Sequence, residues 1–230
     1  MKVYQIRLKL FILEDIFTEN MQSKIAAFID TAFGKSQEFI NFHNTNKFKN
    51  YCFDGLYPIE GENVYKAGNI YTLTIRTIDS KLAIFFNEQL KNHYDKEIKA
   101  LTTEIRIIPK KHIEKVYSIT PIILKDENGY WKGNLTVQNF EDRLKINLIK
   151  KYNTFTGKKI DENFQLYSLL EFKNKKPIAT RYKNITILGD KISINVAENA
   201  EAQELAYMCL GTGLLENNSR GYGFVNFRYL

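Results

Sequence analysis

The sequence predicts an α+β fold made of two tandem ferredoxin-like (RRM-like) β-α-β-β-α-β domains. The first observation is that apolar residues switch between a period of two and a helical period, in that order of elements, along residues 3–108. The second is that residues 115–229 repeat the same order. The third is the length, because 230 residues suit two domains of roughly 100 residues each.

The elements of the first domain follow from local patterns. Residues 3–13 alternate and are partly β-branched or aromatic, which predicts a strand. Residues 18–33 carry an apolar stripe at helical spacing, with Thr18 as the expected N-cap and Gly34 after the last turn. Residues 39–49 are polar and irregular, with one helical turn at most. The remaining elements are expected to be strand, strand, helix and strand over residues 51–56, 70–78, 82–94 and 98–108.

The second domain repeats this organisation. Its elements are expected to be a strand, a helix, the two strands of a hairpin, a helix and a closing strand over residues 115–124, 140–153, 169–182, 185–196, 200–210 and 222–229. The hairpin turn is expected near Lys183-Asn184. Pro109-Lys110-Lys111-His112 separates the two patterns, so we place an N-terminal domain at 1–110 and a C-terminal domain at 111–230.

Composition favours an acidic partner and argues against several classes of protein. The net charge is +7, and nucleic acid is the commonest partner of such a chain. Aromatic residues make up 13% of the chain, which would suit base stacking unless most of the rings lie in the core. Cys52 and Cys209 form no CxxC pair and the three histidines are dispersed, so we expect no metal site and no cofactor.

The start of the chain and its apolar runs indicate where the protein works. Residues 1–7 alternate like a strand and lack the apolar run of a signal peptide. No window reaches 18 apolar residues, so we expect no membrane contact. Two cysteines without a signal peptide fit a reducing cytoplasm.

The most informative segment lies near the C-terminus, where two Gly-x-Gly pairs bracket a polar loop. Gly211-Thr212-Gly213 and Gly221-Tyr222-Gly223 enclose a stretch that carries Arg220. Successive free amides in such a loop would suit phosphate oxygens, and an arginine adds a cationic fork. The segment is not a Walker loop, because no Gly-Lys-Ser/Thr follows. The alternative is a flexible hairpin before a terminal strand.

These residues resemble Cas6, the CRISPR repeat endoribonuclease family within the superfamily of repeat-associated (RAMP) proteins. The double Gly-x-Gly pattern and the following Phe224-Val225 are similar to that superfamily's glycine-rich loop between the last helix and last strand. Thr120-Pro121-Ile122 is similar to the segment that opens its second half. His43, followed by Lys49 and Tyr51-Cys52-Phe53-Asp54, resembles the catalytic region. Some members have a tyrosine in the first helix, where this chain has Asp30 or Thr31.

The resemblance implies metal-independent cleavage of CRISPR precursor RNA within its repeats, which yields guide RNAs. A 2′-hydroxyl attacks the adjacent phosphorus and leaves a 2′,3′-cyclic phosphate and a 5′-hydroxyl. An imidazole has an unperturbed pKa near 6.5, so His43 suits proton transfer as general base or general acid. Lys49, or alternatively Lys47, would stabilise charge on the phosphate. His93 and His112 are interpreted as non-catalytic.

Further RNA contacts are expected in the second domain. The predicted RNA-binding residues are Gly211, Gly213, Asn218, Ser219, Arg220, Gly221, Tyr222, Gly223, Lys175, Lys176 and Arg181. The pair Lys150-Lys151 belongs to the same set of basic clusters, although such runs are usually solvated faces. Trp131 either stacks on a base or packs at a hairpin.

Two other classes of function share some of these sequence features with a repeat nuclease. A non-catalytic RNA-binding subunit of a CRISPR effector complex would share the fold and the glycine loop. A two-histidine phosphoesterase needs two His-x-Thr/Ser motifs, and only His43-Asn44-Thr45 fits, so that class is set aside. The partners expected are repeat RNA and CRISPR effector proteins, and pairing of two copies stays open.

Overall fold

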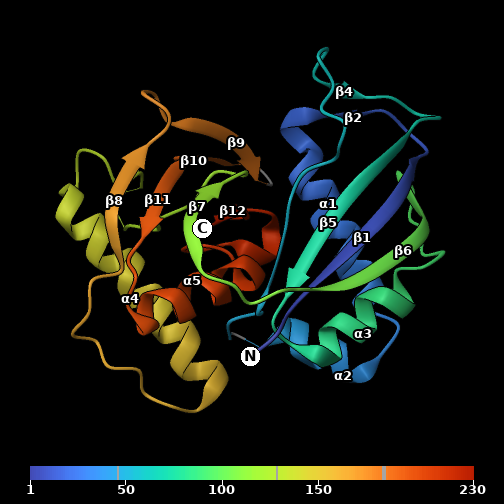
Figure 1. The fold of residues 1–230 in the computed structure, drawn as a ribbon. Coiled ribbons are helices and arrows are strands. Elements are labelled where there is room, and N and C mark those ends of the chain that lie inside the picture. Colours follow the sequence, from blue (N-terminus) through green and yellow to red (C-terminus); the bar gives the residue numbers. More distant parts are fainter. Residues whose placement is uncertain (46, 128, 183–184) are drawn as a thin grey trace.

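The computed structural model describes residues 1–45, 47–127, 129–182 and 185–230. Two lobes stand side by side, each with one four-stranded sheet whose helices cover a single face (Figure 1). We call residues 1–110 the N-terminal lobe and residues 111–230 the C-terminal lobe. The described helices include none that is long and apolar enough to cross a membrane.

The N-terminal lobe holds an antiparallel sheet of four strands in the order β3-β5-β1-β6. The strands are β1 (Val3–Ile12), β3 (Tyr51–Phe53), β5 (Ile70–Thr77) and β6 (Ile98–Ile108). Helices α1 (Thr18–Phe33) and α3 (Ser80–Gln89) pack on the face to which β1 contributes Ile6, Leu8 and Leu10, all fully buried. This order of strands and helices is that of a ferredoxin-like domain.

The C-terminal lobe repeats the arrangement, with the sheet order β12-β7-β11-β8. Its strands are β7 (Ile113–Ser118), β8 (Tyr167–Phe172), β11 (Ile192–Val196) and β12 (Val225–Tyr229), and its helices are α4 (Val137–Thr156) and α5 (Ala200–Thr212). The central position is equivalent in the two sheets, because β1 lies between β5 and β6 and β7 lies between β11 and β12. The predicted fold class of two tandem ferredoxin-like units is confirmed.

The predicted hairpin of residues 169–196 is interrupted, which is a correction to the expectation of two long strands. Four strands form instead: β8 and β11 pair in the main sheet, while β9 (Ile178–Tyr182) and β10 (Ile185–Gly189) form a separate ribbon. The break coincides with Asp190, whose buried carboxylate accepts hydrogen bonds from Tyr130, Trp131 and Asn174. The turn predicted near Lys183-Asn184 lies outside the described residues.

Four other elements differ from the sequence expectation. Residues 37–44 form a helix, α2 (Gln37–Asn44), because Phe39 and Phe42 pack on Phe33 of α1. Thr18 is the first residue of α1 and Phe17 is its N-cap, with no capping side chain. Two short strands, β2 (Ile16–Phe17) and β4 (Val64–Tyr65), pair at one end of the N-terminal lobe.

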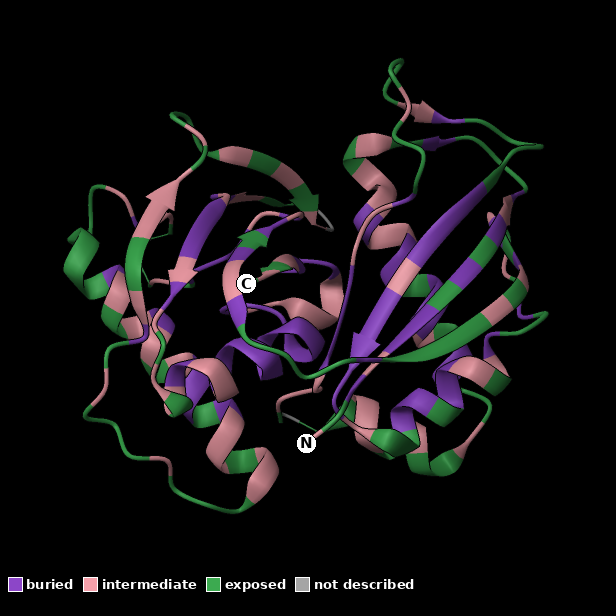
Figure 2. Cartoon of the chain, in the orientation of Figure 1, coloured by how far each residue is buried: buried purple, intermediate pink, exposed green. Residues whose placement is uncertain are grey.

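The lobes meet through helix α5, which Figure 2 shows as mostly buried between the sheets. Gly211 lies in this helix, and a Cβ there would come 2.8 Å from Ile78 Cγ2 and 3.0 Å from the backbone of Thr77. Arg76 of β5 reaches across and donates to the Val225 carbonyl at 2.6 Å and to Asn226 Oδ1 at 2.8 Å. The absence of a side chain at residue 211 therefore lets α5 approach β5 closely.

Candidate RNA-cleavage site

His43 lies in the last turn of α2 and faces a carboxylate on the neighbouring helix α1. Its Nδ1 is 3.3 Å from Asp30 Oδ1, and the two side chains are 34% and 24% exposed. The imidazole also lies beside Phe33, with a distance of 6.0 Å between ring centroids. His43 is thus packed beside Phe33 and Asp30 and remains partly exposed to solvent.

Arg220 reaches the same carboxylate from the opposite lobe. The guanidinium is carried by the 3₁₀ helix η1 (Asn218–Arg220), and its Nη1 donates to Asp30 Oδ2 at 2.5 Å. Burial acts to lower the pKa of Arg220, but the hydrogen bond to Asp30 and the negative charge of that carboxylate, with smaller contributions from neighbouring tyrosines, together outweigh burial and raise the pKa. The structure therefore brings His43 and Arg220 to one carboxylate, across 190 positions of sequence between Asp30 and Arg220.

Lys49 holds the end of the helix that carries His43. Its ammonium donates to the carbonyls of Phe42, His43 and Thr45 at 2.5, 2.9 and 2.7 Å. A cation at a helix C-terminus is favourable because the last carbonyls have no partner within the helix. Burial lowers the pKa of Lys49, the charge of Arg220 lowers it further, and Asp30 acts in the opposite direction.

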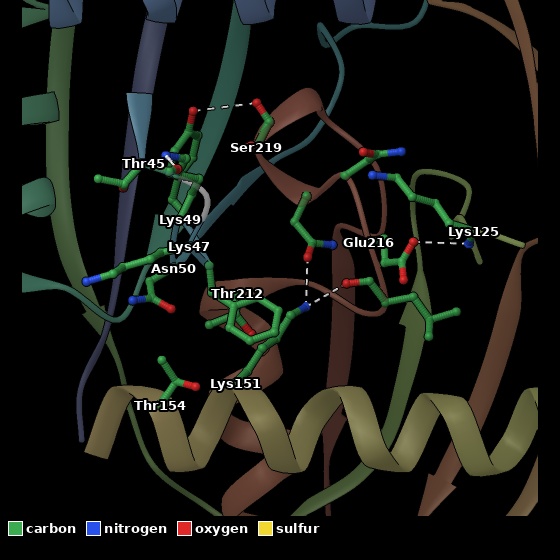
Figure 3. Close-up of a pocket in the computed structure, with 15 residues that line it drawn as sticks. Thr45, Lys47, Lys49, Asn50, Lys125, Lys151, Thr154, Thr212, Glu216 and Ser219 are labelled. Carbon is green, nitrogen blue, oxygen red and sulfur yellow. Dashed lines mark hydrogen bonds between the residues drawn. The ribbon is translucent and has the colours of Figure 1, made fainter. Parts of the chain in front are cut away.

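A polar cleft of about 560 Å³ opens beside this cluster, between the two lobes. Lys47, Lys49 and Asn50 line it from the N-terminal lobe, and Lys125, Glu216 and Ser219 are among the residues that line it from the C-terminal lobe (Figure 3). Lys47 is exposed. Both candidate lysines thus line the cleft, but the ammonium of Lys49 already donates to three carbonyls.

Tyr51 forms part of the wall between the cleft and the Asp30 cluster. It is buried, and its hydroxyl lies 3.5 Å from the Ser219 carbonyl. Burial raises the pKa of this phenol well above its usual range, and the charge of Asp30 adds to that effect. Tyr51 is consequently a neutral hydrogen-bond donor at physiological pH.

The glycine-rich segment is packed rather than open, which corrects the physical reason given for its pattern. The amides of Gly213, Gly221 and Gly223 donate to the carbonyls of Cys209, Asn218 and Pro121. Gly221 has φ +86°, and a Cβ there would lie 1.9 Å from Gln22 Oε1 of α1. These amides are therefore not a free anion nest, and the glycines fit the loop closely against the other lobe.

The polar members of that segment divide into internal and accessible side chains. Asn218 donates from Nδ2 to the carbonyls of Leu214 and Tyr222, and Tyr222 is itself buried. Ser219 and Arg220 remain partly exposed. Their role in RNA binding stays a prediction, as does that of the other members of the loop.

Lys151 is a residue that sequence reasoning misread. It is 3% exposed, and its Nζ donates to Gly213 O, Leu215 O and Asn218 Oδ1 at 2.9, 2.8 and 2.7 Å. Figure 3 shows the bonds to Leu215 and Asn218. Burial lowers its pKa to about 7. The place of Lys151 among Leu144, Leu148 and Ile149 on α4 is the signal that could have shown it as inward-facing.

The predicted basic contacts of the hairpin lie elsewhere. Lys175 and Lys176 are exposed in the loop between β8 and β9, and β9 runs from that loop toward α1 (Figure 1). Arg181 lies near the far end of β9, with Nη1 3.6 Å from Glu19 Oε1 of α1. Only Arg181 of these three is thus placed at α1, the helix that carries Asp30.

The remaining aromatic and histidine candidates have structural positions. Trp131 is 3% exposed, packs between Phe140 and Phe172, and donates its indole hydrogen to Asp190, so the packing alternative is confirmed. His93 is buried, with Nε2 3.0 Å from Thr31 Oγ1. Across the part of the chain that the structure describes, no three His, Cys, Asp or Glu side chains gather in a group that could hold a metal ion.

Comparisons with known proteins point to one family. The family description "CRISPR associated protein Cas6, C-terminal" matches residues 104–227. Two relatives from Methanocaldococcus jannaschii are named CRISPR-associated endoribonuclease Cas6 1 and Cas6 2. The first is 31% identical over 80% of this chain and 75% of its own length, and the second is 24% identical over 84% and 86%.

Solved structures share the fold over nearly the whole chain. A CRISPR associated protein Cas6 superposes with a TM-score of 0.72 at 24% identity, covering 98% of this chain and 99% of the other. A protein described as a RAMP protein binding different RNA substrates superposes with a TM-score of 0.70 at 19% identity, with the same coverage. Both likenesses support the two-lobed architecture.

Proposed function

Because the chain belongs to the Cas6 family of CRISPR-associated proteins, we propose that it is an endoribonuclease that cuts CRISPR precursor RNA within its repeats to produce guide RNAs. The observation that supports this most directly is the position of His43. Its imidazole lies against Asp30, and its own carbonyl accepts a hydrogen bond from Lys49, a residue that lines the cleft between the lobes. A proton-transfer group beside a cationic cleft is what cleavage of a phosphodiester needs.

The proposed reaction uses the RNA's own hydroxyl and no metal ion. The 2′-oxygen forms a bond to the adjacent phosphorus, the bond from phosphorus to the 5′-oxygen breaks, and a cyclic phosphate and a 5′-hydroxyl result. His43 either takes the proton of the 2′-hydroxyl or supplies one to the leaving oxygen, which would contribute roughly 10²–10⁴-fold. Of the two candidate lysines in the cleft, Lys47 is exposed and would contact the phosphate directly, whereas Lys49 could do so only if its ammonium left the carbonyls at the end of α2.

RNA binding is proposed to follow the same side of the molecule. Ser219 and Arg220 would contact the backbone beside the cut, with the glycine loop holding them in place. Lys175, Lys176 and Arg181 would contact phosphates farther along the hairpin. Binding of other CRISPR effector proteins, and pairing of two copies, are separate proposals that co-purification and mass measurement would test.

Cleavage of labelled repeat RNA tests the proposed function. We expect His43→Ala to lower the single-turnover rate at least 10²-fold while the affinity for repeat RNA stays within about twofold. We also expect full activity of the wild type in excess chelator, and no cut when the attacking 2′-hydroxyl is replaced by hydrogen.

Two results would contradict the proposal in different ways. RNA that is bound but never shortened would favour the non-catalytic RNA-binding subunit. A requirement for added Mg²⁺, or cleavage that survives both His43→Ala and the 2′-deoxy substitution, would exclude the proposed chemistry.

A further inference from the structure

The side chain of Asp30 contacts residues of both lobes. Its Oδ1 lies 3.3 Å from Nδ1 of His43, while its Oδ2 accepts from Arg220 at 2.5 Å. The two oxygens of one carboxylate thus serve two different partners. His43 comes from α2 of the N-terminal lobe, and Arg220 comes from η1 of the C-terminal lobe.

A carboxylate in this position controls which nitrogen of the imidazole is free. A carboxylate beside Nδ1 favours the tautomer with hydrogen on Nδ1, which leaves Nε2 unprotonated and turned away from the carboxylate. The 3.3 Å separation is long for a hydrogen bond, but such contacts often tighten only in the complex with substrate. The free nitrogen is the one that can exchange a proton with RNA.

Arg220 in turn fixes the carboxylate. The side chain of Asp30 could otherwise rotate about its Cβ–Cγ bond, but the guanidinium holds one oxygen and so sets the direction of the other. Arg220 itself is positioned by the glycine segment, since Gly221 packs against Gln22 and Phe53 of the N-terminal lobe. The packing of the two lobes therefore positions Arg220, Arg220 positions Asp30, and Asp30 orients His43.

We propose that Asp30 is a positioning residue that orients His43 for cleavage. Arg220 of the C-terminal lobe fixes the carboxylate of Asp30 in turn, so the site is complete only when the two lobes are packed together. This inference rests on the proposed function, because it assigns the proton transfer to His43. It gives Arg220 a role within the protein in addition to any contact with RNA. Asp30 itself touches no reacting atom.

A double-mutant cycle tests whether Asp30 acts through His43. We expect Asp30→Asn to lower the single-turnover cleavage rate roughly 10- to 100-fold, the size expected from misorienting a catalytic group, with RNA affinity within about twofold. In the His43→Ala background the same change should alter the residual rate by less than about twofold. Glu19→Gln is the matched control, because it removes another cross-lobe pair of α1, with Arg181, and should leave the cleavage rate unchanged.

A second measurement is independent of activity. The ¹⁵N shifts of the His43 ring report its tautomer, and only three histidines contribute signals, so His93 and His112 serve as internal references. We expect the wild type to be protonated on Nδ1 and Asp30→Asn to shift the population toward Nε2, with the melting temperature checked in both.

The possible outcomes separate this inference from the proposed function. If the wild type cleaves and His43→Ala does not, but Asp30→Asn retains full rate and an unchanged tautomer, the role of Asp30 is wrong and the proposed function stands. Equal rate losses in the two backgrounds would also overturn it. If the wild type does not cleave repeat RNA, the proposed function fails, and the ¹⁵N shifts still decide whether Asp30 orients the ring.

Discussion

At the scale of single residues, the buried lysine Lys151 determines the conformation of the glycine-rich segment. Its Nζ donates to three oxygens within residues 213–218. Removing the donor would leave the Leu215 carbonyl and Asn218 Oδ1 without this partner, which costs about 1–3 kcal/mol. We expect Lys151→Met to lower the free energy of unfolding by that amount in urea titrations. Lys150→Met, at the exposed neighbouring position, should change it by less than about 0.5 kcal/mol.

The pKa of Lys151 adds a pH dependence with a definite sign. Burial lowers the folded-state pKa to about 7, whereas the unfolded lysine keeps its usual value of 10.5. Between these values the unfolded chain binds more protons, so the wild-type free energy of unfolding, relative to Lys151→Met, rises with pH across that window. Unfolding of both proteins at pH 6.5 and pH 9 checks this, and a difference that is constant or falls with pH would contradict it.

At the scale of an element, the loop that follows α5 owes its glycines to contact between the lobes. Gly221 and Gly68 share a left-handed backbone, with φ +86° and +84°, but a Cβ at Gly221 would meet Gln22 and Phe53 whereas a Cβ at Gly68 would meet nothing within 4 Å. We expect Gly221→Ala to lower the free energy of unfolding by about 1–3 kcal/mol more than Gly68→Ala. The pair isolates packing from backbone strain, since both carry the strain. Equal losses in the two variants would mean that the loop is not fitted against the N-terminal lobe.

At the scale of the whole molecule, Arg76 joins the two sheets. The buried guanidinium donates to Gln5 within its own lobe and to Val225 and Asn226 of β12. Since hydrogen bonds to a charged group contribute about 1.5–3 kcal/mol each, we expect Arg76→Met to lower the free energy of unfolding by about 3 kcal/mol or more. If the lobes become independent in Arg76→Met, the single unfolding transition should instead split into two, one for each lobe.

Arg228 provides the control for that experiment. It is exposed and pairs with Glu114 inside the C-terminal lobe, so Arg228→Met should cost less than about 1 kcal/mol. Calorimetry of both variants compares the two arginines directly. A similar small loss for Arg76→Met would show that the sheets hold together without it.

The sequence by itself determined the architecture of each lobe. Alternation in residues 3–13 and 98–108 predicted β1 and β6, and the apolar stripe of residues 18–33 predicted α1, because side-chain periodicity is a local property of a strand or a helix. The interrupted hairpin was not predictable in this way. At its break Asp190 accepts hydrogen bonds from Tyr130 and Trp131, which lie 60 and 59 positions away in the sequence.

Only the tertiary structure decided how the candidate site is assembled. The sequence singled out His43 and Arg220, but no periodic pattern relates them to Asp30, since Arg220 lies 190 positions from it. The sequence likewise suggested that Lys151, next to Lys150, is solvated, whereas the packing of α4 against the glycine-rich segment buries it. Local patterns fix which face of an element is apolar, whereas the partner of a polar side chain depends on which elements the packing of two lobes brings together.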